Sequence, residues 1–289
     1  MGYQLNGSIT LSQLANHFQL EYTGKDVEIM SAAPYSQVEE NALTFTKAVD
    51  RDVESSVVIT DKVDPEFSHH ASYIITDNPR LLFCKILGYL NDNLGFQSSI
   101  QESYVDSTVR LGENVVIEDG CHISAGVVIE HNVVIQKGTY IGKNSIIRTG
   151  TCVGGAGFGF EKDSEGIPVR FPHLGGVVIG ENVEIGAINS VCCGALSDTI
   201  IGDNVKTDNL VHIAHNCSIG ARTLITACAE LSGGVVVGED VWIGPNCSII
   251  QKVKIGDGAL IGIGAVVRKS VPNKGVVAGN PGKLLRVMD

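Results

Sequence analysis

The strongest constraint in this sequence is a repeat of six residues. Aliphatic side chains recur at every sixth position from Val105 to Val153 without a slip, and the pattern resumes at Ile179. After a slip of four residues it continues from Ile201 to Val267, where Thr207 is the exception. A period of six matches neither a helix, which repeats about every 3.6 residues, nor an alternating strand. It predicts a solenoid of short strands in which each unit sends one aliphatic side chain inward.

The glycines locate the start of this solenoid. Five of the 34 precede Val105, and the other 29 lie between Gly112 and Gly282. Glycine, with Asn and Asp, supplies the backbone angles of tight corners. We therefore expect a mainly β protein in three parts: a small α/β domain at 1–100, a left-handed parallel β-helix at 101–270, and a short C-terminal tail at 271–289.

The first hundred residues have the periodicities of a mixed α/β module. Apolar residues at helical spacing predict a helix within 10–18, and Asn78-Pro79 predicts the start of a second helix, with Asn as its N-cap. Runs of β-branched and apolar residues predict short strands; these lie at 27–33, 43–46, 56–60 and 73–76.

Composition excludes several classes of protein. The chain is 44% hydrophobic and 18% charged, which excludes a disordered polar chain. Its net charge of −11 argues against a nucleic-acid partner. No apolar run approaches the roughly 20 residues of a membrane span, and Met1–Thr10 lacks a secretory signal. We therefore expect a cytoplasmic protein without a membrane span.

The eight cysteines are expected to be free thiols rather than disulfides or zinc ligands. No two of them form a Cys-x-x-Cys pair, and cytosolic proteins rarely contain disulfides. Cys121, Cys217 and Cys247 stand at the small inward position of their repeats. We predict that these three thiols fill the core of the solenoid.

Two segments depart from the repeat. The first, 154–176, is either a tolerated insertion or a loop that covers a substrate. In the second, His215 stands two positions after the inward Ile213 and should point outward from a corner. Gly233 lies 18 residues later, one coil on, about 4.8 Å away. A histidine that acts as a general base and a free backbone N–H that binds the oxyanion are the two groups that acyl transfer needs at minimum.

These segments carry a family resemblance. The run His-Ile-Ala-His-Asn-Cys-Ser-Ile-Gly at 212–220 resembles the catalytic segment of hexapeptide acyltransferases of the lipid A pathway. With 77–83, 157–160 and 194–202, it makes the chain similar to the UDP-3-O-(3-hydroxyacyl)glucosamine N-acyltransferase family. That resemblance implies a homotrimer, no bound cofactor and no metal. It also implies transfer of an acyl group from an acyl carrier protein or coenzyme A thioester to the amino group of a nucleotide-linked amino sugar.

The resemblance also implies roles for particular residues. His215 would be the general base, and the N–H of Gly233 would stabilise the oxyanion. Phe45 would stack on the uracil. The other expected substrate-binding residues are Phe158, Phe160, Asp208, Asn209, His212 and Asn216. From Gln251 to Asp289 there are seven basic and two acidic residues, which favours either an anionic donor or a solvated surface. The expected donor-binding residues are Lys252, Arg268, Lys269, Lys283 and Arg286.

The chain also departs from this family. The Tyr that follows the family's stacking Phe is absent, because 46–49 reads Thr-Lys-Ala-Val. The family's C-terminal helices are absent, and 276–283 resembles the closing segment of sugar acetyltransferases that use coenzyme A. A short-chain acyl-CoA-dependent N-acyltransferase for surface glycan synthesis is therefore an alternative. A non-catalytic or zinc-binding β-helix scaffold is an alternative of another class.

Overall fold

The chain divides into two compact units. The computed structural model describes residues 3–67, 70–98, 100 and 102–288. One unit consists of Met1–Gln97 and Gly159–Leu174, and the other of Ser98–Phe158 and Gly175–Asp289. The division after Gln97 lies close to the boundary expected at residue 100, but the segment 159–174 is part of the first unit. No helix among the described residues is long and apolar enough to cross a membrane.

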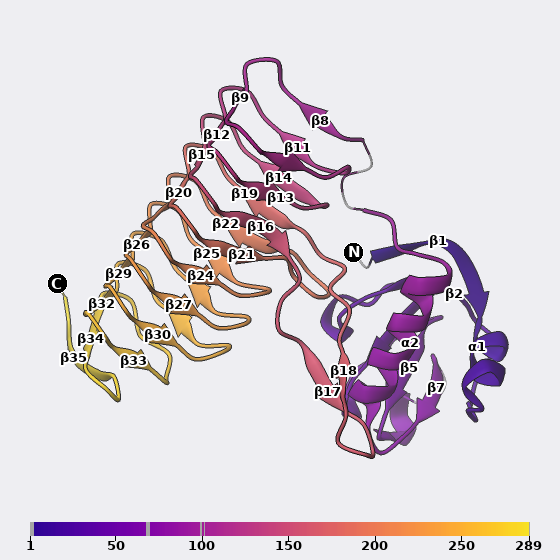
Figure 1. Cartoon of the computed structure of the whole chain (residues 1–289). Coiled ribbons are helices and arrows are strands. Elements are labelled where there is room, and N and C mark those ends of the chain that lie inside the picture. The colour runs from indigo at the N-terminus through magenta and orange to yellow at the C-terminus, as the bar shows by residue number, and fades with distance from the viewer. Residues whose placement is uncertain (1–2, 68–69, 99, 101, 289) are drawn as a thin grey trace. The chain divides into compact units, whose positions relative to one another are not determined.

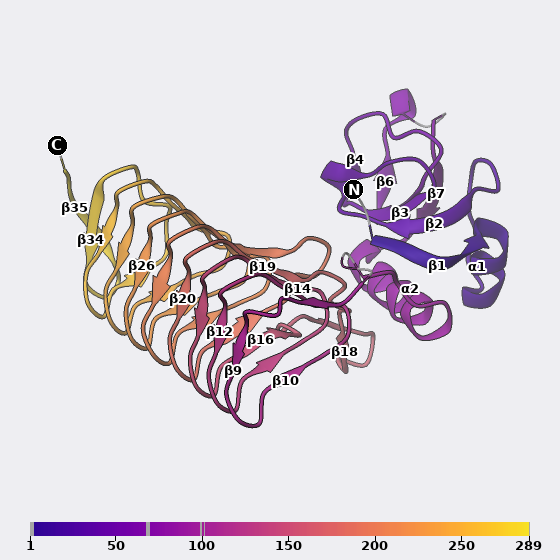
Figure 2. The same cartoon turned by 90° about the horizontal axis from the view of Figure 1, so that it is seen from above.

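The first unit is built on a five-stranded sheet with the order β1-β2-β3-β5-β7 (Figure 2). Strands β2, β3, β5 and β7 are parallel to their neighbours, whereas β1 is antiparallel to β2. The elements of the sheet and its two helices are β1 (Tyr3–Thr10), α1 (Leu11–Phe18), β2 (Glu28–Ala32), β3 (Ala42–Phe45), β5 (Val57–Thr60), β7 (Ser72–Ile75) and α2 (Pro79–Asn93). Smaller elements are η1 (Tyr35–Gln37), β4 (Ala48–Val49), β6 (Lys62–Val63) and η2 (Pro65–Phe67).

Both expected helices form, and each begins at a capping residue. The Gln13 N–H donates to the Thr10 hydroxyl (3.2 Å) at the start of α1. The Leu81 N–H donates to Asn78 Oδ1 (3.1 Å) at the start of α2, where Pro79 occupies the first turn. Strand β1 was not expected, because it is an edge strand with a single buried residue and no regular alternation of apolar side chains.

The inserted segment is a β-hairpin that packs on α2. Its strands β17 (Phe160–Lys162) and β18 (Pro168–Arg170) are antiparallel and lie beside α2 (Figure 1). The Arg80 guanidinium is 2.6 Å from Glu161, and the ring of Phe83 lies 6.0 Å from that of Phe171. Within the first unit, these contacts hold the hairpin against the helix.

The second unit is a three-sided solenoid of parallel strands (Figures 1 and 2). We call its three sheets the first, second and third face. The first face consists of β10 (Val116–Ile117), β13 (Val134–Ile135), β16 (Cys152–Gly155), β21 (Ser190–Cys192), β24 (His212–Ile213), β27 (Glu230–Leu231), β30 (Ser248–Ile249) and β33 (Val266–Val267). The second face consists of β8 (Tyr104–Val105), β11 (His122–Ile123), β14 (Thr139–Ile141), β19 (Val177–Ile179), β22 (Thr199–Ile201), β25 (Ser218–Ile219), β28 (Val236–Val237) and β31 (Lys254–Ile255). The third face consists of β9 (Arg110–Leu111), β12 (Val128–Ile129), β15 (Ile146–Ile147), β20 (Glu184–Ile185), β23 (Lys206–Thr207), β26 (Leu224–Ile225), β29 (Trp242–Ile243), β32 (Leu260–Ile261), β34 (Gly275–Ala278) and β35 (Lys283–Val287).

The six-residue repeat is confirmed as the inner wall of this solenoid. Its inward aliphatic residues form one buried core. The thiols of Cys121, Cys217 and Cys247 are buried in the same core, as predicted, and all eight cysteines are free. The left-handed sense of the coil stays a prediction.

The two interruptions of the repeat are visible in the strand register. Successive coils pair residues 18 apart, as Ile213 pairs with Leu231. The step from Ile141 to Ile179 is 38 residues, because the chain makes the hairpin there. The step from Ile179 to Ile201 is 22 residues, which leaves four extra residues in that coil.

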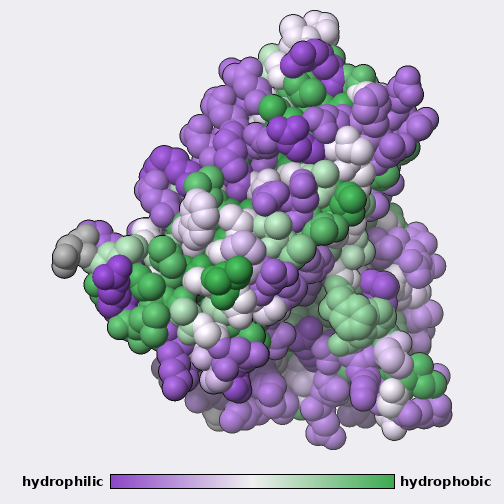
Figure 3. Space-filling model, turned by 60° about the vertical axis from the view of Figure 1, so that its left-hand side comes forward, coloured by the Kyte–Doolittle hydropathy of each residue, from purple (hydrophilic) through white to green (hydrophobic). Residues whose placement is uncertain are grey.

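The C-terminal segment continues the solenoid instead of forming the expected tail. Strand β34 pairs in parallel with β32, and β35 turns back antiparallel to β34. Val277 lies in the core, so burial of an aliphatic side chain holds this segment in place. The side chains of Leu284, Leu285 and Val287 are exposed, and hydrophobic residues gather at this end of the solenoid (Figure 3).

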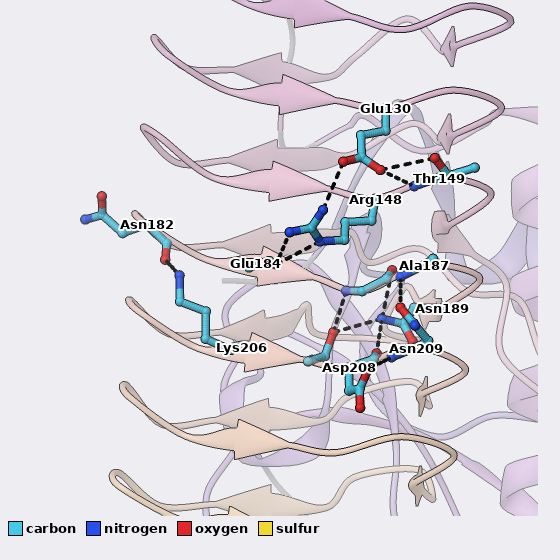
Figure 4. A network of polar contacts seen from close by, with 12 residues as sticks. Glu130, Arg148, Thr149, Asn182, Glu184, Ala187, Asn189, Lys206, Asp208 and Asn209 are labelled. Atoms are coloured by element: carbon cyan, nitrogen blue, oxygen red, sulfur yellow. Dashed lines mark hydrogen bonds and ion pairs between the residues drawn. The ribbon is translucent and has the colours of Figure 1, made fainter.

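Polar ladders link neighbouring coils near the third face (Figure 4). The Arg148 guanidinium binds Glu130 (3.1 Å) on one side and Glu184 on the other. The buried Asn189 amide donates to the Thr207 hydroxyl (2.8 Å). Thr207, the exception to the aliphatic repeat, is therefore accommodated by a hydrogen-bond partner inside the solenoid.

We expect the solenoid to lose stability in alkali. Burial raises the pKa of the Cys217 thiol from 9.0 to about 12. The folded thiol keeps its proton above pH 9.0 while the unfolded thiol releases it, so the folded state binds more protons in this range. The free energy of unfolding should therefore fall as the pH rises above about 9, and it should fall less steeply in Cys217→Ala. Urea titrations at several pH values measure both slopes, and equal slopes would contradict this reasoning.

Candidate active site

His215 and Gly233 meet at the corner between the first and second faces. His215 lies in the turn from β24 to β25, and Gly233 lies in the equivalent turn one coil on, from β27 to β28. The Gly234 N–H donates to the His215 carbonyl (2.9 Å). A Cβ atom at Gly233 would lie 2.6 Å from His215 Nε2. The predicted proximity is confirmed, and only glycine lets the imidazole approach the backbone so closely.

The N–H of Gly233 is available for a ligand. Within the described part of the chain, it donates to no carbonyl or side chain. A backbone donor beside an imidazole nitrogen can stabilise a developing oxyanion while that nitrogen accepts a proton.

Asn216 holds the other side of the imidazole. His215 Nδ1 lies 2.8 Å from Asn216 Oδ1, which also accepts from the Ala195 N–H (3.1 Å). The Asn216 Nδ2 group donates to the Ser197 carbonyl (2.8 Å) and hydroxyl (2.7 Å). The Asn216 N–H donates to the Thr199 hydroxyl (2.9 Å).

This network assigns the tautomer of His215. The Ala195 N–H requires an acceptor and the Ser197 carbonyl requires a donor, so the Asn216 amide has one satisfactory orientation. Its Oδ1 atom can only accept, so Nδ1 of His215 is the donor. In the neutral ring the lone pair then lies on Nε2, the nitrogen that contacts Gly233.

Three other predicted substrate-binding residues lie on the same coil as His215. His212 projects outward from β24, where its neighbours in the sheet are Ser190 and Glu230. Asp208 and Asn209 lie at the other end of β24, at the corner between the third and first faces.

Asp208 and Asn209 take part in the polar ladder of that corner. Asn209 Oδ1 accepts from the Ala187 N–H (2.8 Å), and the Asp208 carbonyl accepts from the Asn189 amide (3.1 Å) (Figure 4). The Asn209 oxygen therefore holds the corner together.

The predicted donor-binding residues divide into two sets. Lys252, Arg268 and Lys269 lie on the coils beyond Gly233, at the same corner as His215; the Lys252 N–H donates to the Gly233 carbonyl (3.0 Å). Lys283 and Arg286 lie instead on β35, at the edge of the third face. The structure therefore brings three of the five cations to the corner of the candidate base and not the other two.

The three predicted aromatic residues are divided between the units. In the first unit, the Phe45 ring packs on Phe83, with centroids 4.7 Å apart, and the Phe160 ring lies 4.6 Å from the Arg170 guanidinium. Phe158 ends a segment of the second unit, and its side chain is 90% exposed.

Two buried thiols of the solenoid keep their protons near neutral pH. Burial raises the pKa of the Cys193 thiol to about 11 and that of Cys217 to about 12, so both thiols stay protonated near neutral pH. No three or more His, Cys, Asp or Glu side chains within the described ranges are placed to hold a metal ion.

The sequence did not point to Ala195, Ser197 or Thr199 as neighbours of the candidate base. They contact Asn216 because the four extra residues of that coil form a loop at the same corner. The slip of the repeat was the signal that could have identified this loop.

We expect Gly233→Ala to displace the His215 ring. The new methyl group would lie 2.6 Å from Nε2 and 2.8 Å from Cε1, and overpacking of this kind costs about 1–3 kcal/mol. A crystal structure of the variant should show a rotated ring, and an unmoved ring would contradict the contact. Gly88→Ala in α2 is the control, because no atom lies within 4 Å of its Cβ position. It should stabilise the protein by up to about 1 kcal/mol.

Comparison with known proteins shows what parts of this chain resemble. The family model described as bacterial transferase hexapeptide (six repeats) matches residues 198–233 and 234–269. A UDP-3-O-acylglucosamine N-acyltransferase from Bordetella avium (strain 197N) is 41% identical over 129 residues, which cover 44% of this chain and 36% of that protein. The protein of the same name from Caulobacter sp. (strain K31) is 43% identical over 133 residues, 46% of this chain and 39% of that protein.

Structural similarity extends over more of the chain. A crystal structure of a UDP-N-acetylglucosamine acyltransferase superposes with a TM-score of 0.51 at 26% identity, covering 62% of this chain and 70% of that one. The matches to curated relatives span little more than a third of those proteins' length. Residues 198–269 thus match a hexapeptide-repeat family model, and part of the chain is similar in sequence to N-acyltransferases.

Proposed function

We propose that this protein is an N-acyltransferase that moves an acyl group from a thioester to the amino group of a nucleotide-linked amino sugar, in the synthesis of lipid A. The observation that carries the proposal is the approach of His215 Nε2 to the backbone of Gly233. The similarity to UDP-3-O-acylglucosamine N-acyltransferases supports the choice of acceptor.

The proposed reaction needs one base and one oxyanion donor. The sugar amine attacks the thioester carbonyl, and His215 Nε2 takes the amine proton as the C–N bond forms. The N–H of Gly233 stabilises the oxyanion of the tetrahedral intermediate. The C–S bond then breaks, and the imidazolium returns its proton to the leaving thiolate. No bound cofactor is part of this sequence.

The donor is proposed to bind along the corner beyond Gly233. Lys252, Arg268 and Lys269 lie on the following coils there, and acyl carrier protein and coenzyme A thioesters are both anionic. A coenzyme A donor, with a surface glycan as product, is the alternative. The nucleobase of the acceptor is proposed to stack on the Phe45 ring. The ring of Phe83 packs against Phe45 and fixes the orientation of the Phe45 ring.

We expect His215→Ala to lower kcat at least about 100-fold, because general-base catalysis contributes about 10²–10⁴-fold. The assay combines acyl carrier protein and coenzyme A thioesters with several nucleotide amino sugars. His131→Ala is the control: His131 Nδ1 accepts from the Glu113 N–H (2.8 Å) in an early coil, and this variant should retain wild-type kcat. Near-normal turnover by His215→Ala would overturn the base assignment.

We further propose a homotrimer in the cytoplasm. All eight thiols are free, which suits a reducing compartment.

At the corner between the third and first faces, Ile188 and Leu210 have φ of 55° and 60° and side chains 62% and 53% exposed. This left-handed backbone costs about 1–2 kcal/mol for residues other than glycine, and Asn132 and Asn246 occupy equivalent positions elsewhere. An interface between copies would bury these two side chains and offset the strain.

We expect Ile188→Asn combined with Leu210→Asn to separate assembly from folding. Asn tolerates positive φ, so each chain should keep its fold while the apolar contact is lost. Sedimentation should give the 30.6 kDa monomer where the wild type is trimeric, with an unchanged circular dichroism spectrum. Ile167→Asn, which replaces an exposed side chain of the hairpin, should remain trimeric. A trimeric double variant would exclude this corner from the interface.

A further inference from the structure

We infer that the loop at 194–198, in the coil with four extra residues, positions the candidate base, and that Ser197 is a positioning residue within it. Ser197 orients the Asn216 amide, and the amide in turn fixes the tautomer of His215. The inference rests on the proposed function of His215, but it also makes a statement about proton position that does not depend on turnover.

The insertion folds into a loop that faces Asn216. A Cβ atom at Gly194 would lie 1.5 Å from the Ser197 carbonyl oxygen and 2.8 Å from Asn216 Nδ2. The loop therefore closes on itself only with glycine at position 194. This closure places the Ser197 carbonyl and hydroxyl within 2.8 Å and 2.7 Å of Asn216 Nδ2.

Hydrogen bonds to the chain returning from the hairpin anchor the same loop. The Gly175 N–H donates to the Gly194 carbonyl (3.0 Å), and the Gly176 N–H donates to Asp198 Oδ1 (2.7 Å). The loop is thus held at its base, while Ser197 extends toward Asn216. Because Ser197 is exposed, its hydroxyl fills no space in the core.

The orientation of the Asn216 amide decides where the His215 proton lies. In the observed orientation Oδ1 faces Nδ1 and accepts its proton. A flipped amide would present its NH₂ group to Nδ1, which would then have to accept, and the proton would move to Nε2. Nε2 could then no longer act as a base. The two acceptors on Ser197 stabilise the orientation that keeps Nε2 unprotonated.

The first test reads the tautomer directly. In solid-state ¹⁵N NMR of histidine-labelled protein, with His215→Ala identifying the resonances, we expect a protonated Nδ1 and an unprotonated Nε2. Ser197→Ala should convert part of the population to the other tautomer, and Ser197→Thr, which keeps the hydroxyl, should restore it. Ser218→Ala in β25, the same substitution farther along this coil, should leave the spectrum unchanged.

The second test reads catalysis with the same variants. Loss of one hydrogen bond to the amide should lower kcat about threefold to tenfold in Ser197→Ala, with KM for both substrates within about twofold. The thermal midpoint should move by less than about 2 °C, because the site is exposed. Ser197→Thr should recover kcat, and Ser218→Ala should match the wild type.

The two tests separate this inference from the function on which it rests. An unchanged ¹⁵N spectrum and unchanged kcat in Ser197→Ala would overturn the inference. A changed tautomer in Ser197→Ala, with turnover intact in His215→Ala, would support the positioning role and overturn the base assignment. Loss of turnover without a change of tautomer would also overturn the inference.

Discussion

The parallel backbone ladder between successive coils is the constraint on which the rest of the second unit depends. It pairs each residue of a regular coil with the residue 18 positions on, at the strand spacing of about 4.8 Å. Inward side chains then stack in one column, and corner residues align from coil to coil. The contact of His215 with Gly233 is one result, since the Gly234 N–H that bonds the His215 carbonyl belongs to the same ladder.

Irregularities in that ladder add further contacts to the candidate site. A regular coil is stabilised by burial of aliphatic side chains and by backbone hydrogen bonds, so its corners need no special side chains. The coil with a 22-residue step is different, because its extra loop provides the Ser197 acceptors that meet Asn216. The 38-residue step sends out the hairpin that packs on α2. Each insertion thus adds contacts that the repeat could not make.

Much of the fold could be predicted from the sequence, and less of the site. An aliphatic side chain at every sixth position is compatible with few structures other than a solenoid. The alignment of His215 with Gly233 follows from the same period. The division of the basic residues could not be predicted, because β35 reverses direction and carries Lys283 and Arg286 onto the third face. The Ser197 contact was missed for a related reason, since side-chain contacts of an irregular loop follow no period.

The proposed chemistry at His215 depends on shielding from water. His215 is held from one side by Asn216 and packs on Gly233, but acyl transfer gains most where water is excluded from the oxyanion and the attacking amine. In the proposed reaction, the bound substrates or a second copy of the chain would supply this shielding. The strained Leu210 corner borders the same face as the His215 corner. In the proposed trimer, a partner copy at the Leu210 corner would lie beside the face that carries His215, which links the proposed assembly to the proposed chemistry.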